Sequence, residues 1–97
     1  MAQNDTKSEE FYLRFSEHLA ESQAWPGIYM FKFVVKSDSP HLDSLKSLFD
    51  ASKAEFSEKL SSKKTFTSLT IKIRMDSPAQ VITIYKKSST LEGVMTL

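Results

Sequence analysis

The stretch KLSSKKTFTSLTIKIRM, residues 59–75, decides the fold of this chain. Over its second half the side chains alternate between polar and apolar, and the apolar set is Leu69, Ile71, Ile73 and Met75. A period of two over this length predicts a long β-strand with one buried face and one wetter face. The hydroxyl- and lysine-rich first half is typical of a turn that leads into the strand.

Three further strands are predicted around this one. Residues 28–36 are aromatic and β-branched, which is typical of a central strand. Residues 54–60 predict a weaker strand that turns through 61–65 into the long one, and residues 94–97 predict a short final strand. Both faces of the 28–36 strand are substantially apolar, so we expect something beyond water to cover each of them.

Two helices are predicted where a serine is followed by a proline, a pair that suits a helix cap and first position. Ser39-Pro40 begins a helix that apolar spacing extends to about Ser52. Ser77-Pro78 begins another, with Gln80 placed to close a capping box.

A further amphipathic helix is predicted over residues 8–21, with Thr6 and Glu9 forming its capping box. Residues 1–7 are polar and we expect them to fray. The apolar stripe of this helix consists of Phe11, Tyr12, Phe15, His18 and Leu19.

The order after that helix is strand, helix, strand, strand, helix, strand, which is the ferredoxin-like βαββαβ arrangement. We expect an α+β sandwich with a four-stranded antiparallel sheet of order 4-1-3-2 and two helices on one face. Residues 1–24 would form a tail and the amphipathic helix, and residues 25–97 the domain. The side chains predicted to meet the helices are Phe31, Phe33, Val35, Leu69, Ile71 and Ile73. Those predicted on the open sheet face are Met30, Lys32, Val34, Phe66, Thr70 and Lys72.

Two partners compete for the open sheet face. Phe66 and Met30, with basic residues around them, suggest a surface for stacking RNA bases, but the aromatic-rich pattern of RNA-recognition sheets is missing. The stripe of the 8–21 helix also needs cover, because an exposed stripe would be a large apolar patch. We therefore expect this helix to pack on the open face, and the alternative is contact with another protein chain.

Composition narrows the classes of function. The 97 residues suffice for one domain, and 13 Lys and Arg against 12 Asp and Glu argue against nucleic acid as a dominant partner. The absence of cysteine excludes disulfides, thiolate metal sites and cysteine nucleophiles. Two glycines cannot build a glycine-rich phosphate loop. No secretion signal or membrane-spanning run is visible, so we expect a cytoplasmic protein without a membrane partner.

Five segments carry a resemblance to a known family: Trp25-Pro26, YMFKFV at 29–34, residues 61–71, Ile84-Tyr85 and residues 93–97. In order and spacing they resemble the YbeD-like family of small bacterial proteins of unknown function. The resemblance covers about residues 25–97 and implies a ferredoxin-like domain akin to ACT-type small-molecule regulatory domains. It implies no catalytic residue, because that family has no assigned activity. The chain departs from the family pattern at Leu60, where proline is common, and at Lys64, where glycine is common.

One turn and one histidine are candidate ligand residues. Hydroxyls, backbone donors and two ammonium groups would surround an anion at Ser61, Ser62, Lys63 and Lys64. A solvated turn whose hydroxyls satisfy the local backbone is the plainer interpretation, and we favour it. The ACT resemblance implies ligands near helix–strand loops or between subunits, which adds His41 to the candidates.

No pattern of catalytic or metal-binding residues is visible. Neither His18 nor His41 has a second histidine at ligand spacing, and the carboxylates are scattered without pairing. We therefore expect no metal, no cofactor and no enzyme activity. The sequence predicts a regulatory or interaction module that binds a small molecule or a protein, with RNA binding through the open face as the alternative. The 54–60 strand would lie at a sheet edge, and a homodimer would pair through this edge, although Glu58 and Lys59 oppose such pairing.

Overall fold

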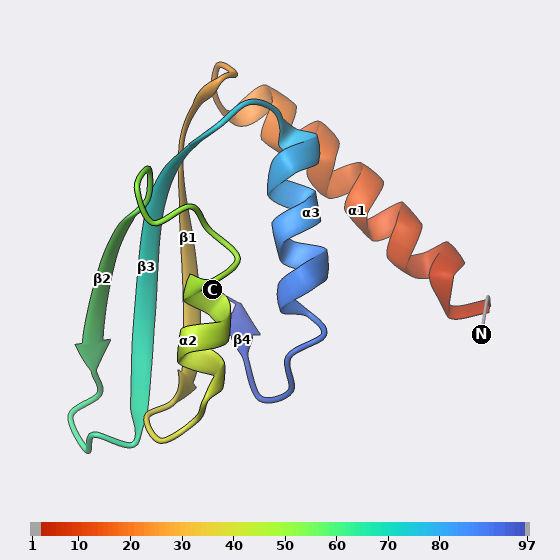
Figure 1. Cartoon of the computed structure of the whole chain (residues 1–97). Coiled ribbons are helices and arrows are strands. Elements are labelled where there is room, and N and C mark those ends of the chain that lie inside the picture. Colours follow the sequence, from red (N-terminus) through yellow and green to blue (C-terminus); the bar gives the residue numbers. More distant parts are fainter. Residues whose placement is uncertain (1–2, 97) are drawn as a thin grey trace.

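The structure, a computed structural model, describes residues 3–96 and the side chains of residues 9–96. The elements in chain order are α1 (Gln3–Ser22), β1 (Gly27–Lys36), α2 (His41–Lys46), β2 (Glu55–Leu60), β3 (Phe66–Met75), α3 (Pro78–Ser88) and β4 (Met95–Thr96). The strands form one antiparallel sheet in the order β2-β3-β1-β4, which is the predicted order 4-1-3-2 counted from the other edge. Helices α2 and α3 lie over one face of the sheet (Figure 1), so the predicted ferredoxin-like fold is confirmed.

Strands β1 and β3 form the central ladder. Their register runs from Gly27 opposite Met75 to Lys36 opposite Phe66. Every second residue of β3 from Thr67 to Met75 is buried, which confirms the period of two that predicted this strand. The predicted helix-facing set is buried as well: Phe31, Phe33, Val35, Leu69, Ile71 and Ile73.

An aromatic cluster fills the space between the sheet and the helices. The ring of Phe31 is fully buried, and its centroid lies 5.1 Å from that of Phe49, 4.8 Å from that of Tyr29 and 5.3 Å from that of Tyr85. Aromatic pairs at such separations contribute about 0.5–1.5 kcal/mol beyond the burial of their area. The cluster therefore holds β1 against α3 and against the segment that follows α2.

Helix α2 is shorter than predicted, and the expectation that it reaches Ser52 is wrong. Beyond Lys46 the chain continues in tight turns, in which the N–H of Leu48 donates to the carbonyl of Leu45. The Asp50 carboxylate then accepts hydrogen bonds from the backbone N–H and the hydroxyl of Ser52. Short polar side chains that bond the local backbone compete with helical hydrogen bonds, which explains the early end.

The starts of α2 and α3 follow the serine–proline pattern in different ways. At α3 the Ser77 hydroxyl accepts from the N–H of Gln80, as predicted, but the Gln80 side chain accepts from the N–H of Asp76 rather than that of Ser77. At α2 the predicted cap is wrong: Pro40 rather than Ser39 occupies the cap position, and the Ser39 hydroxyl accepts from the N–H of His41 at 3.1 Å.

Helix α1 begins at Gln3, so the predicted start at residue 8 and the cap at Thr6 are wrong. Its position differs too. It lies along α3 (Figure 1), with the ring of Phe15 5.4 Å from that of Tyr85 and Leu19 buried in the core. The expectation that this helix covers the open sheet face is therefore wrong.

A short connection explains this placement of α1. The indole N–H of Trp25 donates to the carbonyl of Leu19 at 2.8 Å, which closes the end of the helix. The Gln23 amide donates to the carbonyl of Ile28 at 3.0 Å, and the Trp25-Pro26 peptide bond is cis. These contacts hold the end of α1 against the start of β1, and the apolar stripe then meets α3 on the helix side of the sheet.

Lys64 occupies a left-handed backbone position in the β2–β3 turn. Its φ is 61°, and its N–H donates to the carbonyl of Ser61. A side chain with a Cβ atom costs about 1–2 kcal/mol in this conformation. The glycine that the family pattern favours at this position has no such cost.

We expect Lys64→Gly to raise the free energy of unfolding by up to about 1 kcal/mol, measured by urea denaturation. Glycine also loosens the unfolded chain, which offsets part of the relief. The matched control is Lys63→Gly, which has no positive φ to relieve and should lower stability. If Lys64→Gly lowers stability as much as the control does, the left-handed conformation of Lys64 is refuted.

Candidate functional site

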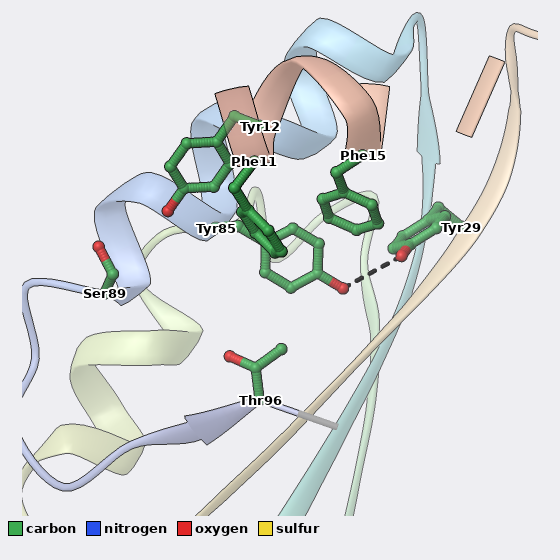
Figure 2. Close-up of a pocket in the computed structure, with 7 residues that line it drawn as sticks. All are labelled: Phe11, Tyr12, Phe15, Tyr29, Tyr85, Ser89 and Thr96. Atoms are coloured by element: carbon green, nitrogen blue, oxygen red, sulfur yellow. Dashed lines mark hydrogen bonds between the residues drawn. The ribbon is translucent and has the colours of Figure 1, made fainter. Parts of the chain in front are cut away.

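A cavity of about 430 Å³ opens between α1, α3, β1 and β4. Figure 2 shows side chains from all four elements turned toward the same space. The lining is mostly aromatic, with hydroxyl groups at its base and side. Its members are Phe11, Tyr12, Phe15, Tyr29, Tyr85, Ser89 and Thr96. We call it the aromatic cavity.

Each wall of the aromatic cavity follows from the local structure. Phe11 and Phe15 are four residues apart on α1, so their rings lie on one side of the helix, 6.1 Å apart. Tyr29 lies on the helix-facing side of β1, because it alternates with the exposed Ile28 and Met30. Phe11 is 62% exposed, which places it at the rim.

Two tyrosine hydroxyls meet at the base of the aromatic cavity. The hydroxyl oxygens of Tyr29 and Tyr85 lie 3.1 Å apart, and one donates to the other (Figure 2). A pair of hydroxyls that shares one hydrogen bond keeps a second O–H and several lone pairs for another group. The base can therefore bind one polar atom of a ligand whose remainder contacts the rings.

Tyr85 stays protonated across the physiological range. Burial raises the pKa of its phenol well above the ordinary value, and the hydrogen bond shared with Tyr29 raises it further. The phenol in the folded chain thus acts as a neutral donor and acceptor. Lys86 lies nearby on the same helix, with its ammonium 5.1 Å from the ring centre of Tyr12.

This pKa shift predicts a loss of stability at alkaline pH. The unfolded chain releases the tyrosine proton near pH 10, whereas the folded chain retains it on Tyr85. Stability that is complete below pH 10 is therefore lost as the pH rises above it. We expect the urea midpoint to fall between pH 9 and pH 11, and to fall less in Tyr85→Phe than in Tyr12→Phe. Equal falls in the two variants would contradict the role of Tyr85.

The open sheet face carries the residues predicted for it. Cross-strand neighbours place Met30 beside Lys72, Lys32 beside Thr70, and Phe66 beside Lys36. Met30 is 51% exposed and Phe66 37%. Near the β2–β3 turn this face is hollowed into a shallow groove of about 510 Å³, lined by Val34, Lys59, Leu60, Ser61, Ser62, Phe66 and Ser68.

The predicted anion residues lie in the β2–β3 turn. Ser61, Ser62, Lys63 and Lys64 are all exposed. The Ser61 hydroxyl accepts from the N–H of Phe66, and the Ser61 N–H donates to the carbonyl of Phe66. The loop before α2 reaches this turn, because the N–H of Ser37 donates to the carbonyl of Thr65. Helix α2 begins at the same end of the sheet as this turn (Figure 1), and its first residue, the half-buried His41, is the remaining candidate. Ligand binding by these residues stays a prediction.

The aromatic cavity was not predicted as a site. Its α1 members belong to the apolar stripe predicted for residues 8–21, and Tyr29 and Tyr85 lie in segments that carry the family resemblance. The sequence predicts no ligand role for any of these residues, nor for Ser89 and Thr96. The sequence does carry a signal for the hydroxyl pair: alternation places Tyr29 on the same face of its strand as Phe31, and helical spacing places Tyr85 on the same side as Val81. A buried phenol needs a polar partner, so two such tyrosines can find each other in a core. Among the side chains of residues 9–96, no group of three or more His, Asp or Glu is placed to hold a metal ion. None of the helices described has the length and apolar character needed to cross a membrane.

The strand order and the helices on one sheet face define a small ferredoxin-like α+β domain. Comparison with family sequence models identifies its family: the model for "Protein of unknown function (DUF493)" matches residues 20–97. The chain belongs to this family, the YbeD family, which confirms the resemblance seen in the sequence.

A solved structure shares the fold. The solution structure of protein HP0495 from H. pylori superimposes with a TM-score of 0.60 at 19% identity, over 78% of this chain and 86% of that one. Comparison with curated protein sequences finds no match.

Proposed function

We propose that the chain is a non-catalytic binding module whose aromatic cavity holds a small, mostly apolar, ring-bearing molecule with one polar group. The observation that carries this proposal is the cavity itself, with aromatic walls and a pair of linked hydroxyls at its base. A regulatory role of the kind ACT-like domains have fits a domain that binds such a molecule without transforming it. The proposed site differs from the one predicted from the sequence, which consists of His41 and the turn at 61–64.

The size and lining of the aromatic cavity support this class of ligand. Sites for small molecules usually enclose about 300–1,000 Å³ and combine apolar walls with few polar groups. Here the walls offer ring faces and edges at Phe15 and Tyr12, and the Tyr29–Tyr85 pair offers the polar contact. A planar ring with a hydroxyl or carbonyl group matches both features.

The same chemistry argues for binding rather than catalysis. A tyrosine that acts as a general base needs a pKa near the working pH. Burial moves the pKa of Tyr85 in the opposite direction, so its phenol hydrogen-bonds without giving up its proton. The hydroxyl of Tyr29 is the hydrogen-bond partner of that phenol.

A pair of matched probes tests the proposal. p-Cresol and toluene share a methyl-bearing ring and differ by one hydroxyl, so their affinities separate the ring contacts from the hydrogen bond. We expect both to bind saturably in amide-shift titrations, with p-cresol the tighter. In Tyr29→Phe/Tyr85→Phe the preference for p-cresol should fall by about two- to tenfold, the value of one hydrogen bond.

The control is Phe66→Ala, on the open sheet face, which should leave both affinities unchanged. Two results would refute the aromatic cavity as a ligand site: no saturable binding of either probe, or a preference for p-cresol that survives removal of both hydroxyls. Removing both partners of a hydrogen bond is nearly neutral for folding, so the double variant keeps the test interpretable.

RNA binding through the open sheet face is the alternative function. Its support is the exposed Phe66 beside basic side chains. Nonspecific single-strand binding relies on several aromatic rings on which successive bases stack, and the described open face carries one. A homodimer through the edge strand β2 also stays a prediction, which sedimentation equilibrium would test.

A further inference from the structure

We propose that the open sheet face docks an acidic segment of a partner protein. This inference goes beyond small-molecule binding and concerns the opposite side of the sheet from the aromatic cavity. Helix α1, the segment of this chain expected to cover the open face, packs on α3 instead. Within residues 3–96 nothing else lies over this face, so its charge and apolar surface are open to a partner.

Charge is concentrated on the open face. The strand register places five cations there, Lys32, Lys36, Lys59, Lys72 and Arg74, against one carboxylate, Glu55. The whole chain has a formal net charge of only +1. Among the described side chains the ion pair is between Lys46 and Glu58, on the helix side, so these five cations are unpaired there. A surface of one sign attracts and orients a partner of the opposite sign.

Exposed apolar side chains accompany these cations. Ile28 is 60% exposed, and Met30 and Met95 about half exposed. Met95 of β4 lies opposite Val34 and Met30 lies opposite Lys72, so methionines and cations share the face. Methionine and arginine are enriched at protein interfaces, and unbranched methionine adapts to the shape of a partner. An acidic segment with interspersed apolar residues therefore fits both features.

The two other occupants of such a face fit less well. RNA would match the charge, but isoleucine and methionine offer no ring on which a base can stack, and Phe66 is the one aromatic side chain there. A second copy of the chain would bring five cations against five cations, and like charges facing each other across an interface are repulsive. The combination of cations with aliphatic side chains favours an acidic protein.

The test uses three probes on the intact chain: a short peptide alternating glutamate with leucine or valine, an oligoglutamate of the same charge, and an oligouridylate of the same charge. We expect the mixed peptide to bind most tightly and to shift amides of β1 and β3 around Met30 and Thr70. The variant Lys32→Glu/Lys72→Glu should lower the affinity for the mixed peptide by about tenfold or more. The neutral variant Lys32→Gln/Lys72→Gln should lower this affinity by less. Because it removes the two charges without reversing them, it also shows whether the charge reversal acts by disturbing the fold.

The matched control is Lys53→Glu/Lys87→Glu, which changes the net charge equally at exposed positions away from the open face. This control should lower the affinity for the mixed peptide by less than about twofold, because distant charges are screened. Tighter binding of the oligouridylate than of the mixed peptide would overturn the proposal in favour of nucleic acid. Equal weakening by the control and the open-face variant, or amide shifts centred on α1 and α3, would overturn it as well.

Discussion

Replacing Phe31 with alanine is expected to lower the free energy of unfolding by about 3–5 kcal/mol. Phe31 is fully buried on the central strand β1, and its ring neighbours come from β1, from α3 and from the segment after α2. Alanine would leave a cavity that these rings, held by different elements, cannot close together. Domains of this size are stable by about 5–15 kcal/mol, so the substitution should remove a large part of the stability of the fold.

Urea denaturation followed by circular dichroism measures this loss. The control is Met30→Ala, the adjacent residue of the same strand, whose side chain is half exposed on the open face. Its effect should stay within about 1 kcal/mol, because surface substitutions leave no cavity. Similar losses at the two positions would contradict the assignment of the two faces of β1.

The second large effect is expected at Leu19, where alanine should cost about 2–5 kcal/mol. Leu19 is 3% exposed although it belongs to the N-terminal helix, because α1 packs along α3 and the Trp25 side chain closes its end. A helix attached only loosely to the sheet would tolerate the change. The size of the loss therefore measures how firmly α1 belongs to the core.

Leu13→Ala on the same helix is the matched control, because Leu13 is 60% exposed. Its cost should stay within about 0.5 kcal/mol, the usual range for surface positions. Thermal unfolding of the two variants, with the wild type alongside, gives the comparison. A small effect at Leu19 would mean that α1 is not part of the core, and the aromatic cavity that it walls would lose its support.

The sheet could be predicted because its strands carry a period of two. The positions of Leu69, Ile71 and Ile73 indicate the buried side of β3. The same alternation in β1 is consistent with the pairing of the two strands. The start of α3 could be predicted as well, because Ser77 and Pro78 specify a cap locally. Features determined by neighbours in the chain are visible in the sequence.

Features determined by distant partners could not be predicted. The stripe of α1 indicates that the helix is covered on one side, but the period alone does not distinguish α3 from the open sheet face. The short connection at Trp25, whose indole N–H donates to the carbonyl of Leu19, places the helix against α3. The end of α2 was missed for a related reason, since the hydrogen bonds of Asp50 and Ser52 compete with a helix that the leucine spacing favours.

The aromatic cavity belongs to this second class. Its walls come from four elements, and Tyr29 and Tyr85 are 56 residues apart in the chain. Each tyrosine alone is an ordinary core residue, and only their meeting beside α1 produces a hydroxyl pair under aromatic rings (Figure 2). The turn at 61–64 and His41, by contrast, are predicted as ligand residues on local composition and on the family resemblance.

The most direct test of ligand binding in the aromatic cavity is a measurement of intermolecular nuclear Overhauser effects between bound p-cresol and the protein. We predict effects from the p-cresol ring to the ring protons of Phe15 and Tyr29 and to the methyl group of Thr96. Effects that connect p-cresol to the methyl groups of Met30 and Met95, on the other side of the sheet, would contradict the account.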